Sequence, residues 1–236
     1  MVFMQQRGDM PSSTRIAALP TESRSWLDNI SPQTRAAMSE TARKVTLSKG
    51  QTLYERKAEA TGIFLIIEGH VRLTFQSSSG AHHLLKIGAP GGVVGDLACV
   101  DGHPYPVFVE AMTPCTLEFI PKNIFEKLRA DYPEINAALL GYFARLSRTM
   151  INMTEVTFLG DINVRVASRI AYLSREYGSQ KLTISQTDLG LIAGLSRQAT
   201  NAALKYLSEL KLIETHYGKI SILDFKALVN FIERST

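Results

Sequence analysis

The 236-residue sequence has few cysteines, with only Cys99 and Cys115. Two cysteines cannot build the disulfide framework of a small secreted domain, and an iron–sulfur cluster takes about four cysteine ligands. A reducing, cytoplasmic setting suits this composition. We expect both residues to be small apolar core side chains, with a thiol switch as the alternative.

Long hydrophobic runs are also missing. No stretch reaches 18 consecutive apolar residues and the mean hydropathy is +0.00, so no transmembrane helix is expected. The N-terminal segment MVFMQQRGDMPSSTR lacks the basic-then-apolar order of a signal peptide. We expect residues 1–30 to form a flexible leader.

The charge excess is small and unevenly placed. The net charge is +4, from 26 Lys and Arg against 22 Asp and Glu. Residues 161–236 hold 10 basic and 7 acidic residues, whereas the first 160 hold 16 and 15. The excess therefore lies in the last third of the chain, which suits a part that touches phosphates.

Short apolar runs separated by glycine-bearing turns fill the region from Val45 to about Pro121. Several strands at this spacing, with no helical pattern between them, predict an all-β barrel or jelly roll. A helix is expected before it, because Ser31-Pro32 is a helix-start signal. The predicted strands are Gly62–Ile67, Val71–Phe75, His83–Ile87, Val107–Ala111 and Thr116–Ile120.

After Pro133 the apolar spacing lengthens to steps of three and four, which predicts a helix of about 25 residues ending near Gly160. Two apolar rows lie on neighbouring faces, so one can pack on the barrel while the other meets a partner helix. A single broad face buried within one chain is the alternative. We assign the first row to a dimer interface: Ile135, Leu139, Tyr142, Leu146, Met150 and Met153. The second row is Leu140, Phe143, Ile151 and Phe158.

The segment from Thr183 to Leu210 has the pattern of a helix-turn-helix. Ser185 caps a first helix, and Asp188 three residues later completes a capping box. Gly194 supplies the positive φ that a sharp turn between two helices needs. Ser196 then caps a second helix. Ile213 to Ile222 alternates around Gly218 as a wing hairpin would, and a closing helix is expected from about Asp224.

The side chains at the start of the second helix are of the kinds that contact base edges in the major groove. Arginine pairs with guanine, and glutamine and asparagine pair with adenine. Lysine and histidine on the wing hairpin suit contacts to phosphate. The DNA-binding candidates are Ser196, Arg197, Gln198, Thr200, Asn201, His216 and Lys219.

From about Ser48 to Asp224 the sequence resembles the CRP/FNR family of transcription regulators. The resemblance rests on residues 49–75 (KGQTLYERKAEATGIFLIIEGHVRLTF), on GDLACVDG at 95–102, and on GLIAGLSRQATNAALKYL at 190–207. It implies an α+β chain with an N-terminal jelly-roll sensor barrel, a long dimerisation helix and a C-terminal winged helix-turn-helix. The expected domains are residues 31–132, 133–160 and 161–236.

The resemblance also implies partners. It predicts a homodimer on double-stranded DNA, with each recognition helix in a major groove of an inverted repeat. RNA polymerase is an expected protein partner, a small-molecule effector is a candidate ligand, and no membrane contact is expected.

The segment that resembles the family's phosphate cassette departs from the cyclic-AMP pattern. Asp96 keeps the acidic function, but Tyr105-Pro106 stands where the resemblance implies an Arg-Ser pair, and no Lys or Arg lies between Lys86 and Lys122. A buried phosphate needs a charged or multiply donating partner. We therefore expect no response to cyclic AMP, and either no effector or an uncharged or weakly acidic organic one. The pocket candidates are Gly95, Asp96, His103, Tyr105, Thr149 and Met150.

Three other interpretations stay open at this point. One is a non-DNA interaction module built on the same barrel, which leaves Arg197 and Gln198 unexplained. A haem sensor would need an axial ligand, for which the candidates are His70, His82, His83 and His103. A cupin-type metal enzyme would use the barrel histidines, but His82 and His83 are adjacent on a strand and point to opposite faces. No cofactor and no metal are assigned, and no enzymatic activity is expected.

Overall fold

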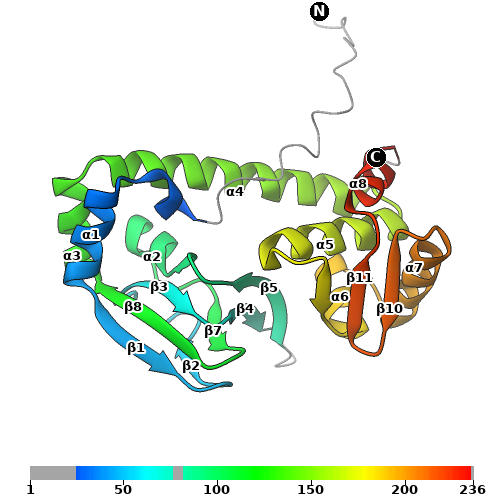
Figure 1. Ribbon diagram of the computed structural model, residues 1–236, viewed down its shortest axis with the longest axis horizontal. Helices are drawn as coiled ribbons and strands as arrows, with labels where there is room; N and C mark the ends of the chain where they lie inside the picture. Colours follow the sequence, from blue (N-terminus) through cyan, green and yellow to red (C-terminus); the bar gives the residue numbers. More distant parts are fainter. Residues whose placement is uncertain (1–24, 77–81, 235–236) are drawn as a thin grey trace, which may run out of the picture.

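The computed structural model describes residues 25–76 and 82–234 of the chain. A long helix, α4 (Glu134–Leu159), runs along one side of the molecule, and two lobes lie side by side along it (Figure 1). The lobe at the N-terminal end of α4 is built from strands, and the other is mainly helical. Of the described helices, none is long and apolar enough to span a bilayer.

The first lobe is a pair of four-stranded antiparallel sheets, so the predicted jelly-roll fold of this region is confirmed. Both inner faces supply one core, which includes Ile63, Val71 and Leu117. The first sheet has the order β1 (Arg43–Leu47), β8 (Cys115–Pro121), β3 (Gly62–Glu68), β6 (Val93–Val94). The second has the order β2 (Thr52–Tyr54), β7 (Phe108–Ala111), β4 (Val71–Gln76), β5 (His82–Gly88).

Three helices accompany the barrel. The predicted helix after Ser31 is α1 (Pro32–Thr41), and the Ser31 side chain accepts a hydrogen bond from the Thr34 amide. Two further helices, α2 (Asp96–Asp101) and α3 (Lys122–Asp131), were not expected from the apolar pattern. The first of them has only six residues, too few to show a helical period.

The predicted boundary of the leader is wrong at its C-terminal end. Residues 26–29 form a short 3-10 helix, η2 (Trp26–Asn29), in which Trp26 is fully buried and Leu27 is 4% exposed. Both side chains belong to the barrel core. Burial of the indole ring removes a large apolar area from water and so favours this position of the segment. The remainder of the predicted leader, residues 1–24, lies outside the described residues.

The long helix forms as predicted, but most of the row assigned to a dimer interface faces its own chain. The exceptions are Met150 of that row, which is 40% exposed, and Phe143 of the second row, which packs on the barrel. Ile135 and Leu139, assigned to a partner chain, are buried in this chain's own barrel core. Tyr142 and Leu146 face the barrel, and Met153 packs on the core of the second lobe. The assignment of this row to a dimer interface is therefore wrong.

The other side of α4 carries an exposed seam, by which we mean positions 140, 144, 147, 151, 154 and 158, spaced in steps of four and three. All six are exposed, and the apolar ones strongly so: Leu140 is 73%, Ile151 65% and Phe158 81% exposed. Such a spacing is typical of a helix that packs along a second helix. The remaining members are Ala144, Ser147 and Thr154.

The second lobe is a winged helix-turn-helix, as predicted. Gly160 ends α4, and the Asp161 carboxylate then caps α5 (Ile162–Tyr177) by accepting from the amides of Asn163 and Val164. The other helices are α6 (Gln186–Ala193), α7 (Arg197–Glu209) and α8 (Phe225–Arg234). A three-stranded antiparallel sheet has the order β10 (Ile213–His216), β11 (Lys219–Ile222), β9 (Lys181–Thr183).

Candidate DNA-binding surface and sensor pocket

Side-chain caps fix where the two helices of the helix-turn-helix begin. Ser185 accepts from the Asp188 amide at the start of α6, and Ser196 accepts from the Ala199 amide at the start of α7. Between them Gly194 adopts a φ of 64°, in the left-handed region that glycine favours. These devices fix where one helix ends and the next begins, so they set the direction of α7.

The exposed tip of α7 carries Arg197, Gln198 and Asn201, all on the solvent side. Among the described residues no ion pair or side-chain hydrogen bond is recorded for these three. They are therefore available to a ligand, and they are the residue types that contact base edges. The Ser196 hydroxyl oxygen is used as the cap but the residue is exposed, so it stays near any phosphate at this helix end.

Thr200 does not belong to this exposed surface. It is fully buried, and its hydroxyl donates to the Ser196 carbonyl at 2.9 Å. A Cβ added at Gly190 would lie 2.6 Å from the Thr200 Oγ1, so the two helices cross at this point with no spare room. Thr200 holds α7 against α6, so the predicted role of Thr200 as a DNA contact is wrong.

The wing is the β10–β11 hairpin, where His216 pairs with Lys219 in the antiparallel register. Lys219 is exposed, and the His216 ring lies 3.4 Å from the Glu214 carboxylate. Tyr217, at the tip, is fully exposed at 105%. This tyrosine was not among the residues predicted to bind DNA. Its place beside the turn glycine Gly218 could have indicated an exposed aromatic side chain at the wing tip.

Arg165 of α5 hydrogen-bonds to the turn between α6 and α7. Its guanidinium donates to the Ala193 carbonyl through Nε at 3.1 Å and through Nη2 at 2.6 Å, and to the Gly194 carbonyl at 2.9 Å. These carbonyls end α6, where a helix carries partial negative charge and unpaired acceptors. The arginine thus ties α5 to the turn that precedes α7.

Replacing Arg165 by methionine keeps the apolar stem and removes these hydrogen bonds. We expect the free energy of unfolding to fall by about 1–3 kcal/mol, the usual range for bonds to a charged donor. The control is Lys205→Met on α7, which removes only an exposed ion pair to Glu209 at 3.9 Å and should cost at most about 0.5 kcal/mol. Equal losses in chemical denaturation would contradict this role for Arg165.

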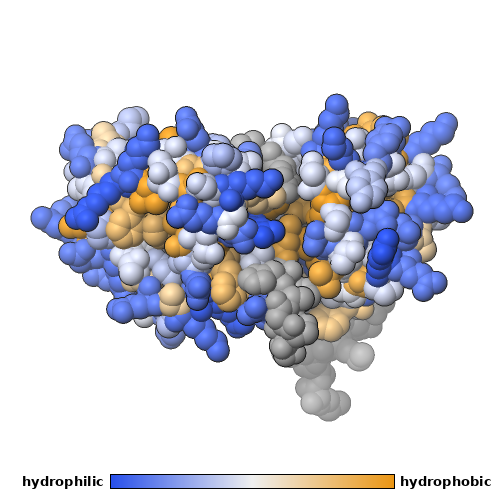
Figure 2. Space-filling view, turned by 90° about the horizontal axis from the view of Figure 1, so that it is seen from below, coloured by the Kyte–Doolittle hydropathy of each residue, from blue (hydrophilic) through white to orange (hydrophobic). Residues whose placement is uncertain are grey.

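A pocket of about 840 Å³ lies between the barrel, α4 and the second lobe. Figure 2 shows the face opposite α4, where hydrophobic side chains extend into the recess between the two lobes. The barrel contributes the turn before α2, and the second lobe contributes Tyr172, Arg175 and Phe225. A ligand in this pocket would touch both lobes, and the volume is within the range of small-molecule sites.

Four of the six predicted pocket residues line this cavity: Gly95, Asp96, Thr149 and Met150. Gly95 has a φ of 89° and begins α2. The Thr149 hydroxyl donates to the Arg145 carbonyl of its own helix at 3.1 Å, so that hydrogen is not offered to a ligand. The hydroxyl oxygen can still accept.

The other two predicted pocket residues are elsewhere. The His103 side chain is 79% exposed and contacts Asp101. Tyr105 is buried, stacked on Tyr54 at 3.8 Å, and its hydroxyl donates to the Gly62 carbonyl at 2.7 Å. The predicted roles of His103 and Tyr105 in effector binding are therefore wrong.

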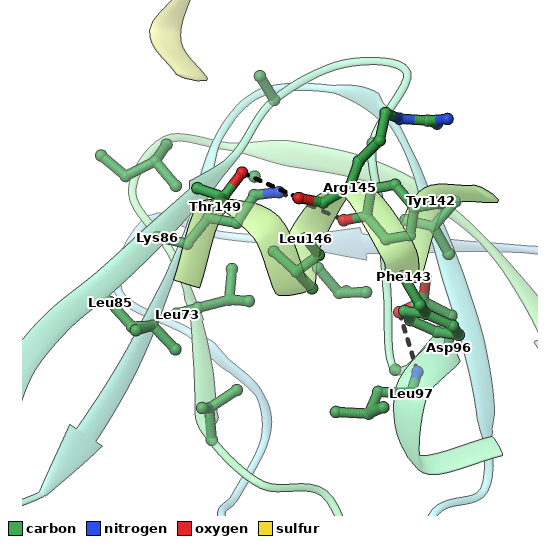
Figure 3. A pocket seen from close by; sticks show the side chains of 18 of the residues that line it. Leu73, Leu85, Lys86, Asp96, Leu97, Tyr142, Phe143, Arg145, Leu146 and Thr149 are labelled. Atoms are coloured by element: carbon green, nitrogen blue, oxygen red, sulfur yellow. Dashed lines mark hydrogen bonds between the residues drawn. The ribbon is translucent and has the colours of Figure 1, made fainter. Parts of the chain in front are cut away.

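The pocket also holds groups that the sequence reasoning overlooked. Lys86 of β5 and Arg145 of α4 line it, and the Lys86 amine donates to the Tyr142 hydroxyl at 3.4 Å (Figure 3). The cassette itself has no Lys or Arg between Lys86 and Lys122. The cations of the pocket come instead from a strand and a helix outside the cassette.

Asp96 is buried, and both of its carboxylate oxygens accept hydrogen bonds. Oδ2 accepts from the Trp26 indole at 3.0 Å. Oδ1 accepts from the Leu97 amide at 3.0 Å, as Figure 3 shows. Burial raises the pKa of this carboxyl above its ordinary value, and the two hydrogen bonds counteract part of that rise. The indole partner lies 70 residues away in sequence.

The two cysteines are unpaired and buried. Burial raises the pKa of the Cys99 thiol to about 11. The thiolate is the reactive form, so Cys99 is mostly protonated near neutral pH and suits a small core residue. Cys115 donates to the backbone carbonyls of His70 and Thr113.

The comparisons with known proteins agree with this architecture. Residues 44–132 match the family described as cyclic nucleotide-binding domain, and residues 164–231 match the Crp-like helix-turn-helix domain. The CRP-like cAMP-activated global transcriptional regulator of Mycobacterium tuberculosis is 27% identical over 207 residues, which cover 84% of this chain and 92% of that one. The cAMP-activated global transcriptional regulator CRP of Escherichia coli is 26% identical over 180 residues, which cover 73% and 85%.

Solved structures show the same fold. The c-di-GMP responsive global regulator CLP of Xanthomonas campestris superposes with a TM-score of 0.68 at 18% identity, covering 82% of this chain and all of that one. FixK2 of Bradyrhizobium japonicum superposes with a TM-score of 0.65 at 18% identity, covering 80% and 96%.

The metal-enzyme alternative finds no support among these relatives, which are regulators and not enzymes. The side chains of His82 and His83, on which that alternative rested, lie outside the described side chains. The barrel agrees with the first matched domain and the winged helix-turn-helix with the second, and the long helix α4 lies between the two. The chain belongs to the CRP/FNR family of transcription regulators.

Proposed function

We propose that this regulator acts as a homodimer on an inverted-repeat operator in double-stranded DNA. The observation that carries the proposal is the tip of α7, where Arg197, Gln198 and Asn201 are exposed at the start of a firmly capped helix. Their chemistry fits base edges in a major groove. Lys219 and His216 on the wing fit the phosphates on either side.

The exposed seam of α4 is the proposed dimer interface. Leu140, Ile151 and Phe158 would leave a row of apolar side chains in water on a monomer, whereas a second copy of α4 covers them with the same residues. The small Ala144 and Ser147 between them allow the two helices to approach closely. A two-fold axis along this seam relates two copies of α7 and matches the symmetry of an inverted repeat.

The sensor barrel regulates this dimer through its pocket. The relatives from M. tuberculosis and E. coli are cAMP-activated, but we propose that cyclic AMP does not regulate this chain. Pro106 lines the pocket and offers no donor, and the Tyr105 hydroxyl is bonded to Gly62. A small organic effector fits this pocket better. RNA polymerase is the proposed protein partner, in the cytoplasm.

Selection of bound DNA from a random library tests the DNA-binding proposal. The expected product is one sequence family, containing two inverted half-sites centred about one helical turn apart. Affinity for the recovered site should fall steeply as salt rises, because phosphate contacts release counterions. Recovery of unrelated sequences, or of single half-sites alone, would overturn the proposal.

A further inference from the structure

Trp26 is placed where it determines what the pocket can recognise. Its indole nitrogen donates to Asp96, and its ring is fully buried against Phe125, with 5.9 Å between the ring centroids. A ligand hydroxyl would have to share a carboxylate oxygen that already accepts from the indole or from the Leu97 amide, so this acceptor is weaker than that of an unpaired carboxylate. Asp96 is therefore engaged by the protein itself.

The segment that carries Trp26 is held by contacts on the C-terminal side of this residue. The Arg35 guanidinium donates to the Leu27 carbonyl and lies 3.9 Å from the Asp28 carboxylate. Ser31 donates to Glu134, the first residue of α4, through its hydroxyl at 2.6 Å and through its amide at 3.2 Å. These ties fix the tryptophan in its position beside Asp96, so displacing it would break several contacts at once.

Among the charged groups of the pocket, cations outnumber carboxyls by three to two. Lys86, Arg145 and Arg175 line it, against the two carboxyls of Asp28 and Asp96. The Nε and Nη2 atoms of Arg145 are buried, and neither has a hydrogen-bond partner in the part of the chain that the structure describes. A buried guanidinium is stable only with a compensating acceptor, which a ligand anion would supply.

The greater part of the lining is apolar. It includes Leu73, Ile87, Val94, Val107, Phe143 and Leu146. Figure 3 shows Leu73, Phe143 and Leu146 beneath the long helix, with Lys86 and Tyr142 close by. Such walls favour a hydrocarbon body over a sugar, because buried hydroxyls there would find few partners.

We infer that this pocket takes a small organic anion with an apolar body and no sugar, with its charged end at Arg145 and Lys86. Trp26 is the specificity-determining residue, since its indole shares the Asp96 carboxylate and thereby weakens the acceptor that a ribose hydroxyl would need. The inference rests on the proposed function only in assuming that this pocket is the effector site.

The ligand class is tested by calorimetry on the full-length protein without DNA. The probes are straight-chain carboxylates from propionate to decanoate and 4-phenylbutyrate, each paired with the alcohol of the same length. We expect at least one carboxylate to bind about tenfold or more tightly than its alcohol, because only the anion makes a charge-assisted hydrogen bond. Equal binding of acid and alcohol, or no binding by any carboxylate, would overturn the ligand class.

Two matched variants locate the charge. Arg145→Gln should remove the preference for the anion, whereas Arg148→Gln, an exposed cation on the same helix, should keep it. If both variants keep the preference, Arg145 does not hold the anion. Operator binding measured on the same preparations separates this failure from a failure of the DNA-binding proposal.

The role of Trp26 has its own readout, because it is the only tryptophan of the chain. Its fluorescence should be poorly quenched by acrylamide, as expected of a buried indole, and Asp96→Ala should increase the quenching. Trp26→Phe keeps the packing on Phe125 and removes the donor, so affinity for cyclic AMP should rise by about tenfold. A well-quenched wild-type tryptophan, or an unchanged affinity in Trp26→Phe, would contradict this role.

Discussion

Replacing Ile151 by glutamate is expected to convert the dimer into monomers. Ile151 is 65% exposed in the single chain and lies at the middle of the exposed seam of α4. A symmetric interface brings two copies of each change together, so the variant loses two apolar contacts and gains two like charges. We expect the dimer dissociation constant to rise by about a hundredfold or more, measured by sedimentation velocity over a range of concentrations.

Two further variants make this test specific. Leu223→Glu introduces the same charge at an exposed leucine outside α4 and should leave the dimer unchanged. Leu146→Glu changes the face of α4 that lines the pocket and should also leave it dimeric. If Leu146→Glu is monomeric while Ile151→Glu stays dimeric, the dimer interface is the row predicted from the sequence. That result would contradict the assignment of the interface to the exposed seam.

The second large effect is expected at the tip of α7. Arg197→Ala should weaken binding to the selected operator by about 1–3 kcal/mol and relax base preference at one position in each half-site. Lys219→Ala on the wing should instead weaken all sequences about equally and lower the slope of binding against salt by about 1. Fluorescence anisotropy with the operator and with single-base variants measures both.

This pair of variants distinguishes base contact from general attraction. If Arg197→Ala lowers affinity equally for every sequence, the arginine contacts phosphate rather than a base. If it binds the operator as the wild type does, α7 does not enter the major groove.

Much of the fold follows from local sequence signals. Five of the eight barrel strands (β3, β4, β5, β7 and β8) were predictable as short apolar runs between turn residues, whereas the short strands β1, β2 and β6 were not predicted. The helix-turn-helix was predictable because Ser185, Gly194 and Ser196 are local devices whose effect does not depend on the rest of the chain. The short helix α2 has no such signal, and it was missed.

The orientation of α4 shows what periodicity leaves undecided. Spacing in threes and fours identifies two rows on one helix, but both rows are apolar. Which row faces the barrel depends on where the chain enters the helix, and Ile135 and Leu139 are carried into the core directly after α3. That choice is made by tertiary packing, so the sequence pattern alone could not make it.

The pocket was the hardest part to predict, because its residues come from distant segments. Trp26 reaches Asp96 across 70 positions, and Arg145 approaches from a different helix. The cassette sequence correctly predicted Asp96 as a pocket residue, but it also predicted Tyr105. The Tyr105 hydroxyl instead donates a hydrogen bond to the Gly62 carbonyl. A long-range hydrogen bond between single residues leaves no periodic trace.

Operator spacing tests the central claim most directly. The two copies of α7 in a dimer joined through α4 must reach the same face of the DNA, so the half-sites have one permitted separation. Inserting about 5 bp, half a helical turn, between the selected half-sites should reduce binding to the level of a single half-site. Unchanged affinity after this insertion would show that the two lobes bind independently, and it would contradict a symmetric dimer on an inverted repeat.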